Sequence, residues 1–127
     1  MPTGLGAKLL GQTGTSTAAA GMLAVANPEG EDILVTQFLV DTLVAATAAF
    51  TFNAGIAPSS TGAADNLIDG IDASTKLVFS NLKDGGTNGR VAVKWKSTEF
   101  LTISSDTGAL GIFSGRAYAN YVHPSST

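Results

Sequence analysis

Three carboxylates in the segment DNLIDGID come nearest to a chemical site. Asp65, Asp69 and Asp72 follow one another at intervals of four and three residues, and converging carboxylates are the ligands that Ca²⁺ takes. The alternating acids and closing glutamate of an EF-hand loop are absent. Asp is also a common turn and capping residue, and we favour that role. Asp65 is expected to cap one short helical turn over residues 66–68, which Gly70 ends.

A second group of acids lies in and directly after the segment NPEG. Glu29, Glu31 and Asp32 are more suggestive of a charged rim than of a metal site. Asn-Pro-Glu-Gly itself predicts a four-residue turn, because proline presets φ and glycine accepts a positive φ at the exit. We therefore assign neither a metal nor a cofactor to either acidic group.

Residues suited to catalysis are scarce in this chain. His123 is the single histidine and lies in the terminal segment HPSST. A Ser-His-Asp triad would have to use it, and no Gly-x-Ser-x-Gly elbow is present. The glycine-rich loop KDGGTNGR lacks the Gly-Lys-Ser/Thr ending of a phosphate-binding loop. We expect no enzyme, and a hydrolase would depend on His123.

Composition narrows the classes of partner. The chain has 127 residues, a usual size for one domain, and only 13% of them are charged, about half the usual quarter. Its seven Lys and Arg residues are scattered and its net charge is −3, so a nucleic-acid partner is not expected. There is no cysteine. Apolar runs are too short for a membrane span or a signal peptide, and we expect synthesis in the cytoplasm.

Short apolar and β-branched runs, separated by glycine-rich turns, predict an all-β domain. We expect a two-sheet antiparallel β-sandwich, jelly-roll-like, because the Cys-Trp-Cys core of immunoglobulin domains is absent. Turns are expected at 81–89 and at SDTG, residues 105–108. The expected strands run from Ala18 to the NPEG turn and over Ile33–Val44, Ala45–Ile56, Lys76–Ser80, Arg90–Lys96, Phe100–Ser104 and Leu110–Val122.

Three parts of the chain are distinguished by composition. Residues 1–17 are rich in Gly and Thr and are expected to form an extended N-terminal arm that is either disordered or ordered by a neighbour. Residues 18–122 form the β-sandwich domain, and residues 123–127 a C-terminal tail.

The strand Ile33–Val44 looks apolar on both faces. Ile33 and Val35 alternate with Leu34, and Phe38 falls on the same face as Leu34. A sandwich covers one face of a strand, so the other face is expected to meet a further layer or another molecule. In the strand over 90–96, Val91, Val93 and Trp95 share a face and are predicted to be core, which outweighs the alternative of Trp95 as a stacking platform.

The order of several segments adds a resemblance. They are NPEG at 27–30, ILVTQFLVD at 33–41, AGI at 54–56, DNLIDGID at 65–72, GTNGR at 86–90 and GRAYANY at 115–121. In this order they resemble a family of small proteins encoded among the head genes of tailed bacteriophages, the capsid auxiliary or decoration ("cement") proteins. The likeness covers about residues 18–122, and NPEG followed by DNLIDG carries most of it.

The resemblance implies a structural virion protein. Such a protein binds the outer surface of an assembled capsid and bridges neighbouring major capsid subunits, without catalysis. Its partners would be the phage major capsid protein and copies of itself, trimers among the possible assemblies. We nominate as contact residues Leu5, Lys8, Leu9 and Leu10 in the arm and Glu29, Glu31 and Asp32 on the rim, with plain solvent exposure as the alternative for each.

A different class of function stays open. A carbohydrate-binding or host-adhesion β-sandwich on the virion surface would need an exposed aromatic platform with polar neighbours. Tyr118, Tyr121 and Trp95 are the candidates for it.

Overall fold

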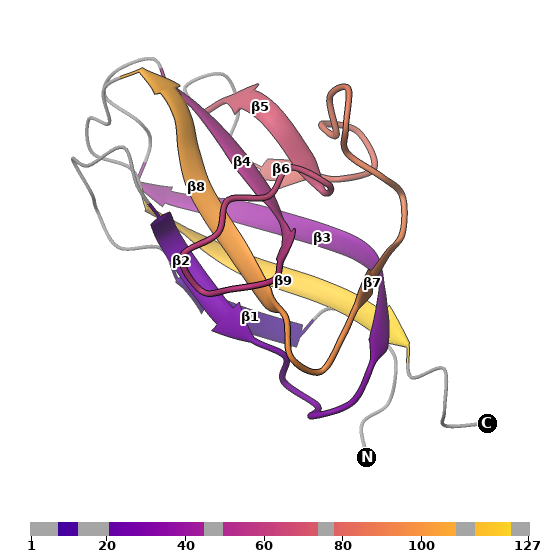
Figure 1. The fold of residues 1–127 in the computed structure, drawn as a ribbon. Coiled ribbons are helices and arrows are strands. Elements are labelled where there is room, and N and C mark those ends of the chain that lie inside the picture. The colour runs from indigo at the N-terminus through magenta and orange to yellow at the C-terminus, as the bar shows by residue number, and fades with distance from the viewer. Residues whose placement is uncertain (1–7, 13–20, 45–49, 74–77, 109–113, 123–127) are drawn as a thin grey trace.

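A computed structural model describes residues 8–12, 21–44, 50–73, 78–108 and 114–122 (Figure 1). Within these ranges the chain contains no helix, and its strands form two antiparallel sheets. The predicted all-β, two-sheet antiparallel fold is therefore confirmed. The jelly-roll connectivity stays a prediction.

The first sheet, here called sheet A, lies behind the second in Figure 1. Its strand order is β1-β9-β3-β6, and β7 pairs with β3 beside β6. The strands of sheet A are β1 (Lys8–Gln12), β3 (Ile33–Val44), β6 (Val78–Ser80), β7 (Val93–Trp95) and β9 (Ser114–Val122). The long strands β3 and β9 pair along nearly their whole length, so they form the centre of this sheet.

The second sheet, sheet B, has the strand order β2-β8-β4-β5. Its strands are β2 (Gly21–Ala26), β4 (Phe50–Ala57), β5 (Ile68–Asp72) and β8 (Phe100–Gly108). β8 continues to Gly108 and pairs with β4 over residues 100–108, so the turn predicted at SDTG is wrong. Ladder pairing with β4 offers that segment more backbone hydrogen bonds than an isolated turn does.

The predicted helical turn over residues 66–68 is also wrong. Ile68 opens β5, which pairs with β4 through Ala54. Leu67 and Ile68 are both fully buried, and burying two such side chains is worth about 3–6 kcal/mol. This burial outweighs the roughly 1 kcal/mol that an Asp cap gives to a single helical turn.

The start of the domain lies inside the predicted arm. Residues 8–12 form β1, whose register pairs Lys8 with Ala119 and Leu9 with Tyr118 on β9. β1 is thus an edge strand of the sandwich. Residues 1–7 and 13–20, and the predicted tail at 123–127, lie outside the described residues.

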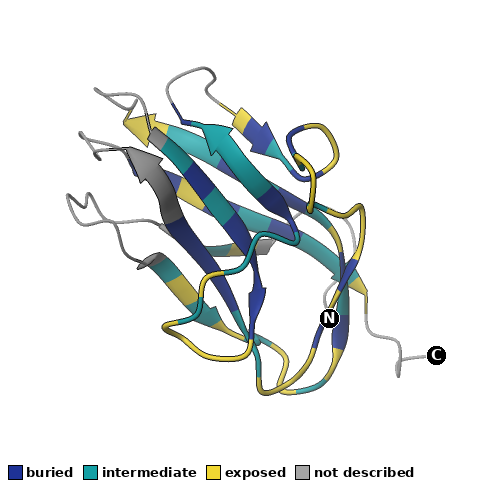
Figure 2. Ribbon diagram, turned by 45° about the horizontal axis from the view of Figure 1, so that its top comes forward, coloured by how far each residue is buried: buried dark blue, intermediate teal, exposed yellow. Residues whose placement is uncertain are grey.

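The hydrophobic core fills the space between the two sheets, where the buried positions of facing strands lie (Figure 2). Its largest side chain is Trp95, which is fully buried at the end of β7. Phe52 of β4 and Phe79 of β6 meet edge to face across the sandwich, with ring centroids 5.1 Å apart. Such a pair adds about 0.5–1.5 kcal/mol beyond the area that it buries.

A β-bulge explains why β3 looks apolar on both faces. Val35 pairs with Tyr121 and Gln37 pairs with Asn120, so Thr36 is an extra residue opposite β9. One extra residue exchanges the two faces of a strand. Ile33 and Val35 before the bulge, and Phe38 and Val40 after it, are consequently all buried in the core. The residues left on the outer face are Leu34, Gln37, Leu39 and Asp41.

Candidate interaction surfaces

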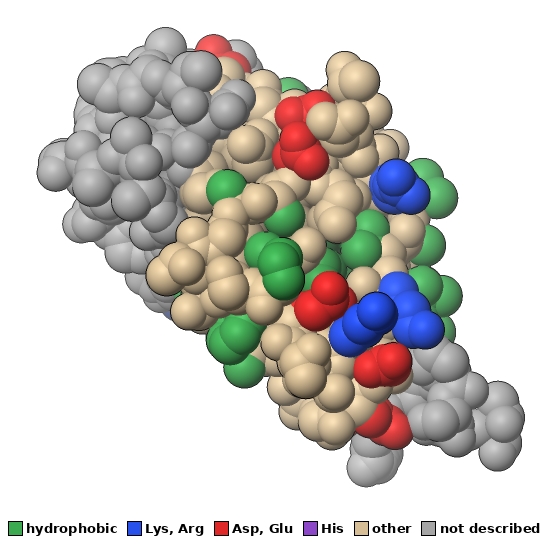
Figure 3. Space-filling view, in the orientation of Figure 1, with side chains coloured by type: hydrophobic (Ala, Val, Ile, Leu, Met, Phe, Trp, Pro, Cys, Tyr) green, Lys and Arg blue, Asp and Glu red, His purple; other side chains and the backbone are tan. Residues whose placement is uncertain are grey.

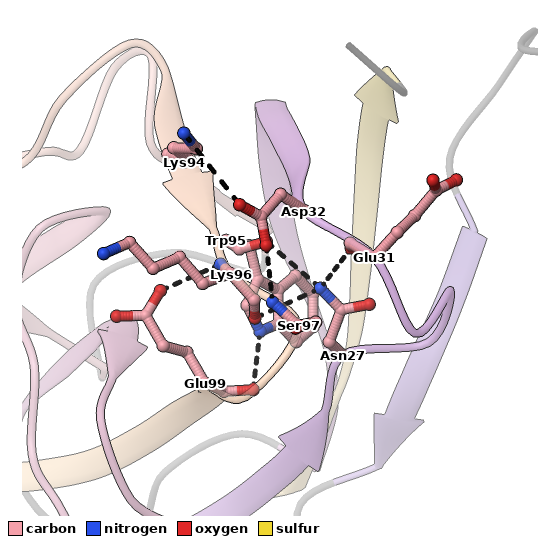
Figure 4. A network of polar contacts seen from close by, with 8 residues as sticks. All are labelled: Asn27, Glu31, Asp32, Lys94, Trp95, Lys96, Ser97 and Glu99. Carbon is pink, nitrogen blue, oxygen red and sulfur yellow. Dashed lines mark hydrogen bonds and ion pairs between the residues drawn. The ribbon is translucent and has the colours of Figure 1, made fainter. Parts of the chain in front are cut away.

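The NPEG turn forms as predicted, and Asn27 holds it. The side-chain Oδ1 of Asn27 accepts hydrogen bonds from the backbone N–H groups of Glu29 (2.9 Å) and Gly30 (3.1 Å). Gly30 has a φ of 72°, the left-handed conformation that glycine adopts without strain. Asn27 Nδ2 donates to the carbonyl oxygens of Glu31 (2.9 Å) and Trp95 (3.1 Å), which fastens the turn to the end of β7 (Figure 4).

Trp95 anchors the same end of the molecule from inside. Its ring is buried and its Nε1–H donates to the carbonyl oxygen of Glu99 at 2.9 Å. Val93 is buried beside it, as predicted, but Val91 is 68% exposed, so its predicted core position is wrong. β7 begins only at Val93, which leaves Val91 outside the ladder. Because Trp95 is buried, it offers no surface for stacking a sugar or a base.

The predicted rim acids lie on the surface around this turn. Asp32 Oδ1 accepts from the backbone N–H of Ser97 at 3.0 Å, and Asp32 Oδ2 lies 4.0 Å from Lys94 Nζ. Both side chains are about half-exposed, so the ion pair stabilises the fold by at most about 1 kcal/mol.

Figure 4 shows the carboxylate of Glu31 directed away from this network. Acidic and basic side chains lie next to each other at this end of the molecule (Figure 3). We call Glu29, Glu31, Asp32 and Lys94 the charged rim.

Glu29 is held from a different strand. The hydroxyl of Tyr121, near the end of β9, donates to Glu29 Oε2. The Tyr121 ring packs against the core. Burial of Tyr121, its hydrogen bond to Glu29 and the negative charge of Glu29 all raise the pKa of the phenol above its ordinary value. Tyr121 therefore joins β9 to the rim.

The structure describes two of the four nominated arm side chains, Leu9 and Leu10. Leu9 is 52% exposed on the outer face of sheet A. The register shifts between Leu9 and Gly11, and Leu10 packs against the core instead. Lys8 lies in β1, and its side chain is outside the described residues, as is the whole of Leu5. Of the two nominated arm side chains that the structure describes, Leu9 is the one exposed on the surface.

The outer face of sheet A is a surface that strand alternation did not identify. The register of β3 and β9 places residues there in rows: Leu34 with Val122, Gln37 with Asn120, Leu39 with Tyr118, and Asp41 with Arg116. β1 extends one row with Leu9, β6 extends another with Val78, and β7 extends the row of Leu34 with Lys94. Leu9, Val78 and Val122 are each about half-exposed, although they are large apolar residues. This face is therefore open to solvent and partly apolar.

The outer face of sheet B is covered by the chain itself around Gly55, unlike the outer face of sheet A. Gly55 of β4 pairs there with Thr102 of β8, and the position is covered by the chain segment that follows β4. Asn66 Oδ1 accepts from the N–H of Ile56 at 2.8 Å, as another strand would. A Cβ on Gly55 would collide with that oxygen and lie 2.8 Å from the backbone nitrogen of Asn66. Thr102 is only 2% exposed, so this part of sheet B is closed.

The acids of DNLIDGID fasten two loops together. Asp65 Oδ2 accepts from Asn88 Nδ2, and Asp69 Oδ2 accepts from the backbone N–H of Asn88, each at 3.0 Å. The N–H of Asp69 donates to the carbonyl oxygen of Gly85 at 2.9 Å. Asp72 lies apart on β5, opposite Thr51. Within the described ranges, no three His, Cys, Asp or Glu residues are grouped to hold a metal ion.

Comparison with protein-family models, with curated proteins and with solved structures gave no match to this chain. Within the part of the chain that the structure covers, no helix is long and apolar enough to cross a membrane. His123, on which a hydrolase would depend, lies outside the described residues. Function is therefore inferred from the charged rim and the outer face of sheet A.

Proposed function

We propose that this protein is a structural component of a tailed-bacteriophage virion. It is made in the host cytoplasm, binds the outer surface of the assembled capsid and stabilises it by bridging neighbouring major capsid subunits. The observation that supports this role best is that one domain exposes two surfaces of different character, which adjoin at Lys94. The charged rim lies at the NPEG turn, and the outer face of sheet A spreads over β1, β9, β3 and β6. A bridging protein needs more than one contact, and we assign the rim to the shell and the outer face of sheet A to a further protein partner.

Side-chain hydrogen bonds fix the loops of this domain to its strands. Asparagine side chains replace missing backbone partners at three separate places. Asn27 closes the NPEG turn against β7, Asn66 pairs with Ile56, and Asn81 pairs with Phe38. Each bond ties a loop to a strand, so the loops keep their position when a partner binds. A pre-organised surface loses less conformational entropy on binding.

Stabilisation of a shell by such a protein is a linkage effect. A ligand that binds the assembled shell and not its separated subunits favours assembly by RT ln(1 + [L]/Kd), about 2.7 kcal/mol per site at a hundredfold excess over Kd. The free energies from many such sites on one shell add up. A copy that contacts two subunits also raises the effective concentration of its second contact. No catalytic residue is needed for this work.

We assign the contact with the shell to the charged rim, together with the residues that precede β1. Glu29 and Asp32 are exposed, and their positions are fixed by Tyr121 and Ser97. Charged contacts at a rim act mainly on association rate and depend on salt. The carbohydrate-binding alternative has less support, because Trp95 is buried and the Tyr121 hydroxyl is bound to Glu29.

The test is co-sedimentation of the purified protein with empty mature shells of the virus that encodes it. A deletion of residues 1–7 probes the arm without removing β1, which a deletion of 1–17 would destroy. Lys94→Glu reverses one rim charge. Lys83→Glu makes the same charge change in the loop after β6 and serves as the control.

We expect saturable binding that weakens with Lys94→Glu and with the deletion, and that Lys83→Glu leaves unchanged. Absence of saturable binding at micromolar protein would contradict the proposed function for that shell. Equal weakening by both lysine variants would contradict the assignment of the rim and leave only a general charge effect.

A further inference from the structure

We propose that the outer face of sheet A binds the same face of a second copy of this chain. The two copies are related by a two-fold axis that lies in the interface and runs along the strands, between β3 and β9. The purified protein should form this dimer without a capsid.

The register of β3 and β9 defines what this face presents. Four outward rows follow one another along the two strands: Leu34 and Val122, Gln37 and Asn120, Leu39 and Tyr118, Asp41 and Arg116. The amide side chains of Gln37 and Asn120 meet at 3.1 Å, which shows that they share a face. The residues between these rows on β9, Ala117 and Ala119, are buried on the opposite side.

A two-fold axis between the two strands exchanges β3 with β9. Each residue of β3 then faces its own row partner from the second copy. Arg116 faces the second copy's Asp41 and Asp41 faces the second copy's Arg116, so two ion pairs form. In the neighbouring rows, Tyr118 meets Leu39 and Asn120 meets Gln37. Each row is therefore complementary to itself under this symmetry.

The charge pattern favours a copy of the same chain over other occupants. The row of Asp41 and Arg116 contains one acid and one base, so this row has no net charge to attract a nucleic acid or an anionic surface. Unlike charges side by side are self-complementary under a two-fold axis, whereas like charges in that row would repel. Tyr and Arg are also the side chains that interfaces favour.

The size and polarity of the face fit a stable dimer. Four strands are about 15–20 Å wide and the twelve-residue β3 is about 36–40 Å long, so the face covers at most about 540–800 Å², because β1, β6 and β9 are shorter than β3. This upper bound reaches the ~800 Å² per partner of standard interfaces. Leu9 and Val78 flank the central rows and are about half-exposed. Two sheets that pack face to face with nearly aligned strands are a common arrangement. Because sheets twist, the closest contact is expected at the Leu39 and Asp41 rows.

The experiment measures the mass of the full chain by sedimentation velocity across micromolar concentrations. Asp41→Arg gives a copy with two basic residues in the row formed by residues 41 and 116, and Arg116→Asp gives a copy with two acidic residues there. Each variant alone places like charges opposite each other in the proposed dimer. Mixing the two variants restores an acid opposite each base, although each copy keeps like charges within its own row.

We expect a concentration-dependent dimer for the natural chain, and a dimer at least about tenfold weaker for either variant alone. We expect the mixture to recover a heterodimer, which an effect on folding alone cannot produce. Lys83→Glu is the control for net charge and should dimerise normally. A monomer at all concentrations, a dimer that both variants leave unchanged, or a mixture that stays monomeric would each overturn this inference. Shell binding is measured separately by co-sedimentation, so a monomeric protein that still binds shells would overturn the dimer and leave the proposed function standing.

Discussion

The hydroxyl of Tyr121 donates a hydrogen bond of 2.5 Å to the carboxylate of Glu29, 92 residues earlier in the chain. This contact joins the final strand of sheet A to the NPEG turn. The turn is tied independently to Trp95 through Asn27. The charged rim is thus fixed to two strands of the same sheet, β9 and β7, and its position follows from the register of that sheet.

The first prediction concerns the pH dependence of this contact. The folded state raises the pKa of Tyr121 above its ordinary value of 10.0, so folding favours the protonated phenol. The contribution to stability is complete below pH 10 and is lost as the pH rises through the folded pKa. We expect the melting temperature to fall in alkaline solution, and to fall less for Tyr121→Phe.

Spectrophotometric titration of the two tyrosines checks the assignment. Tyr118→Phe leaves Tyr121 as the single phenol, and this variant should titrate above pH 10. Tyr121→Phe leaves Tyr118 and gives the comparison curve. If the Tyr118→Phe protein titrates at the pH of a free tyrosine, the hydrogen bond to Glu29 does not persist in solution.

The second prediction concerns Gly55. Its missing side chain makes room for Asn66, whose amide pairs with the backbone of Ile56. In Gly55→Ala, the new Cβ would collide with Asn66 Oδ1 and lie 3.0 Å from Ala64 Cβ. Crowding of this kind costs about 1–3 kcal/mol, and losing the Asn66 hydrogen bonds costs about 1 kcal/mol more.

Urea unfolding measures this loss. Gly30→Ala is the matched control. A Cβ at Gly30 meets nothing within 4 Å, so this variant measures only the cost of placing alanine at a positive φ. That substitution should cost about 1–2 kcal/mol. A Gly55→Ala protein as stable as Gly30→Ala would show that Asn66 does not pack against β4 as described.

The sequence of this chain predicts where strands lie more readily than it predicts which side of the sheet each side chain occupies. Val, Ile and Phe runs ending at Asn-Pro or Gly-Gly predict strands, and the predicted bounds of Ile33–Val44 are confirmed. The face of a residue depends on pairing with a distant strand. Thr36 is an extra residue only because Tyr121 and Asn120 are consecutive on β9, and nothing local to Thr36 indicates it.

Of the two candidate surfaces, one could likewise be predicted from the sequence and the other could not. The charged rim could be predicted because Glu29 and Asp32 belong to a turn with a strong local signal. The outer face of sheet A could not, because Asp41 and Arg116 are far apart in sequence and meet only through the register. The sequence around Asp65 predicts a helix cap, but its carboxylate instead accepts a tertiary hydrogen bond from Asn88.

The third prediction concerns Asn81, which is buried. Its Oδ1 accepts from the N–H of Phe38 at 2.8 Å, and its Nδ2 donates to the carbonyl oxygen of Arg90 at 2.9 Å. Asn81→Ala leaves both of these backbone groups without a partner, at a cost of about 2–4 kcal/mol. Asn88→Ala removes one side-chain hydrogen bond, from Nδ2 to Asp65, at an exposed position, and should cost at most about 1 kcal/mol. Thermal denaturation compares the two, and equal losses would contradict a specific role for burial at Asn81.

The fourth prediction tests the bulge in β3. Deleting Thr36 removes the extra residue, so a regular ladder with β9 would turn Ile33 and Val35 out of the core. Exposing two fully buried side chains costs about 3–6 kcal/mol, much of the 5–15 kcal/mol by which domains are stable. The exposed Thr36 side chain makes only one long hydrogen bond, to Asn120 O at 3.4 Å, so Thr36→Ala should change stability by less than about 0.5 kcal/mol. Circular dichroism and urea unfolding of both variants provide the measurement. A deletion variant that folds as stably as Thr36→Ala would mean that β3 pairs with β9 in another register, and the rows on the outer face of sheet A would then be different.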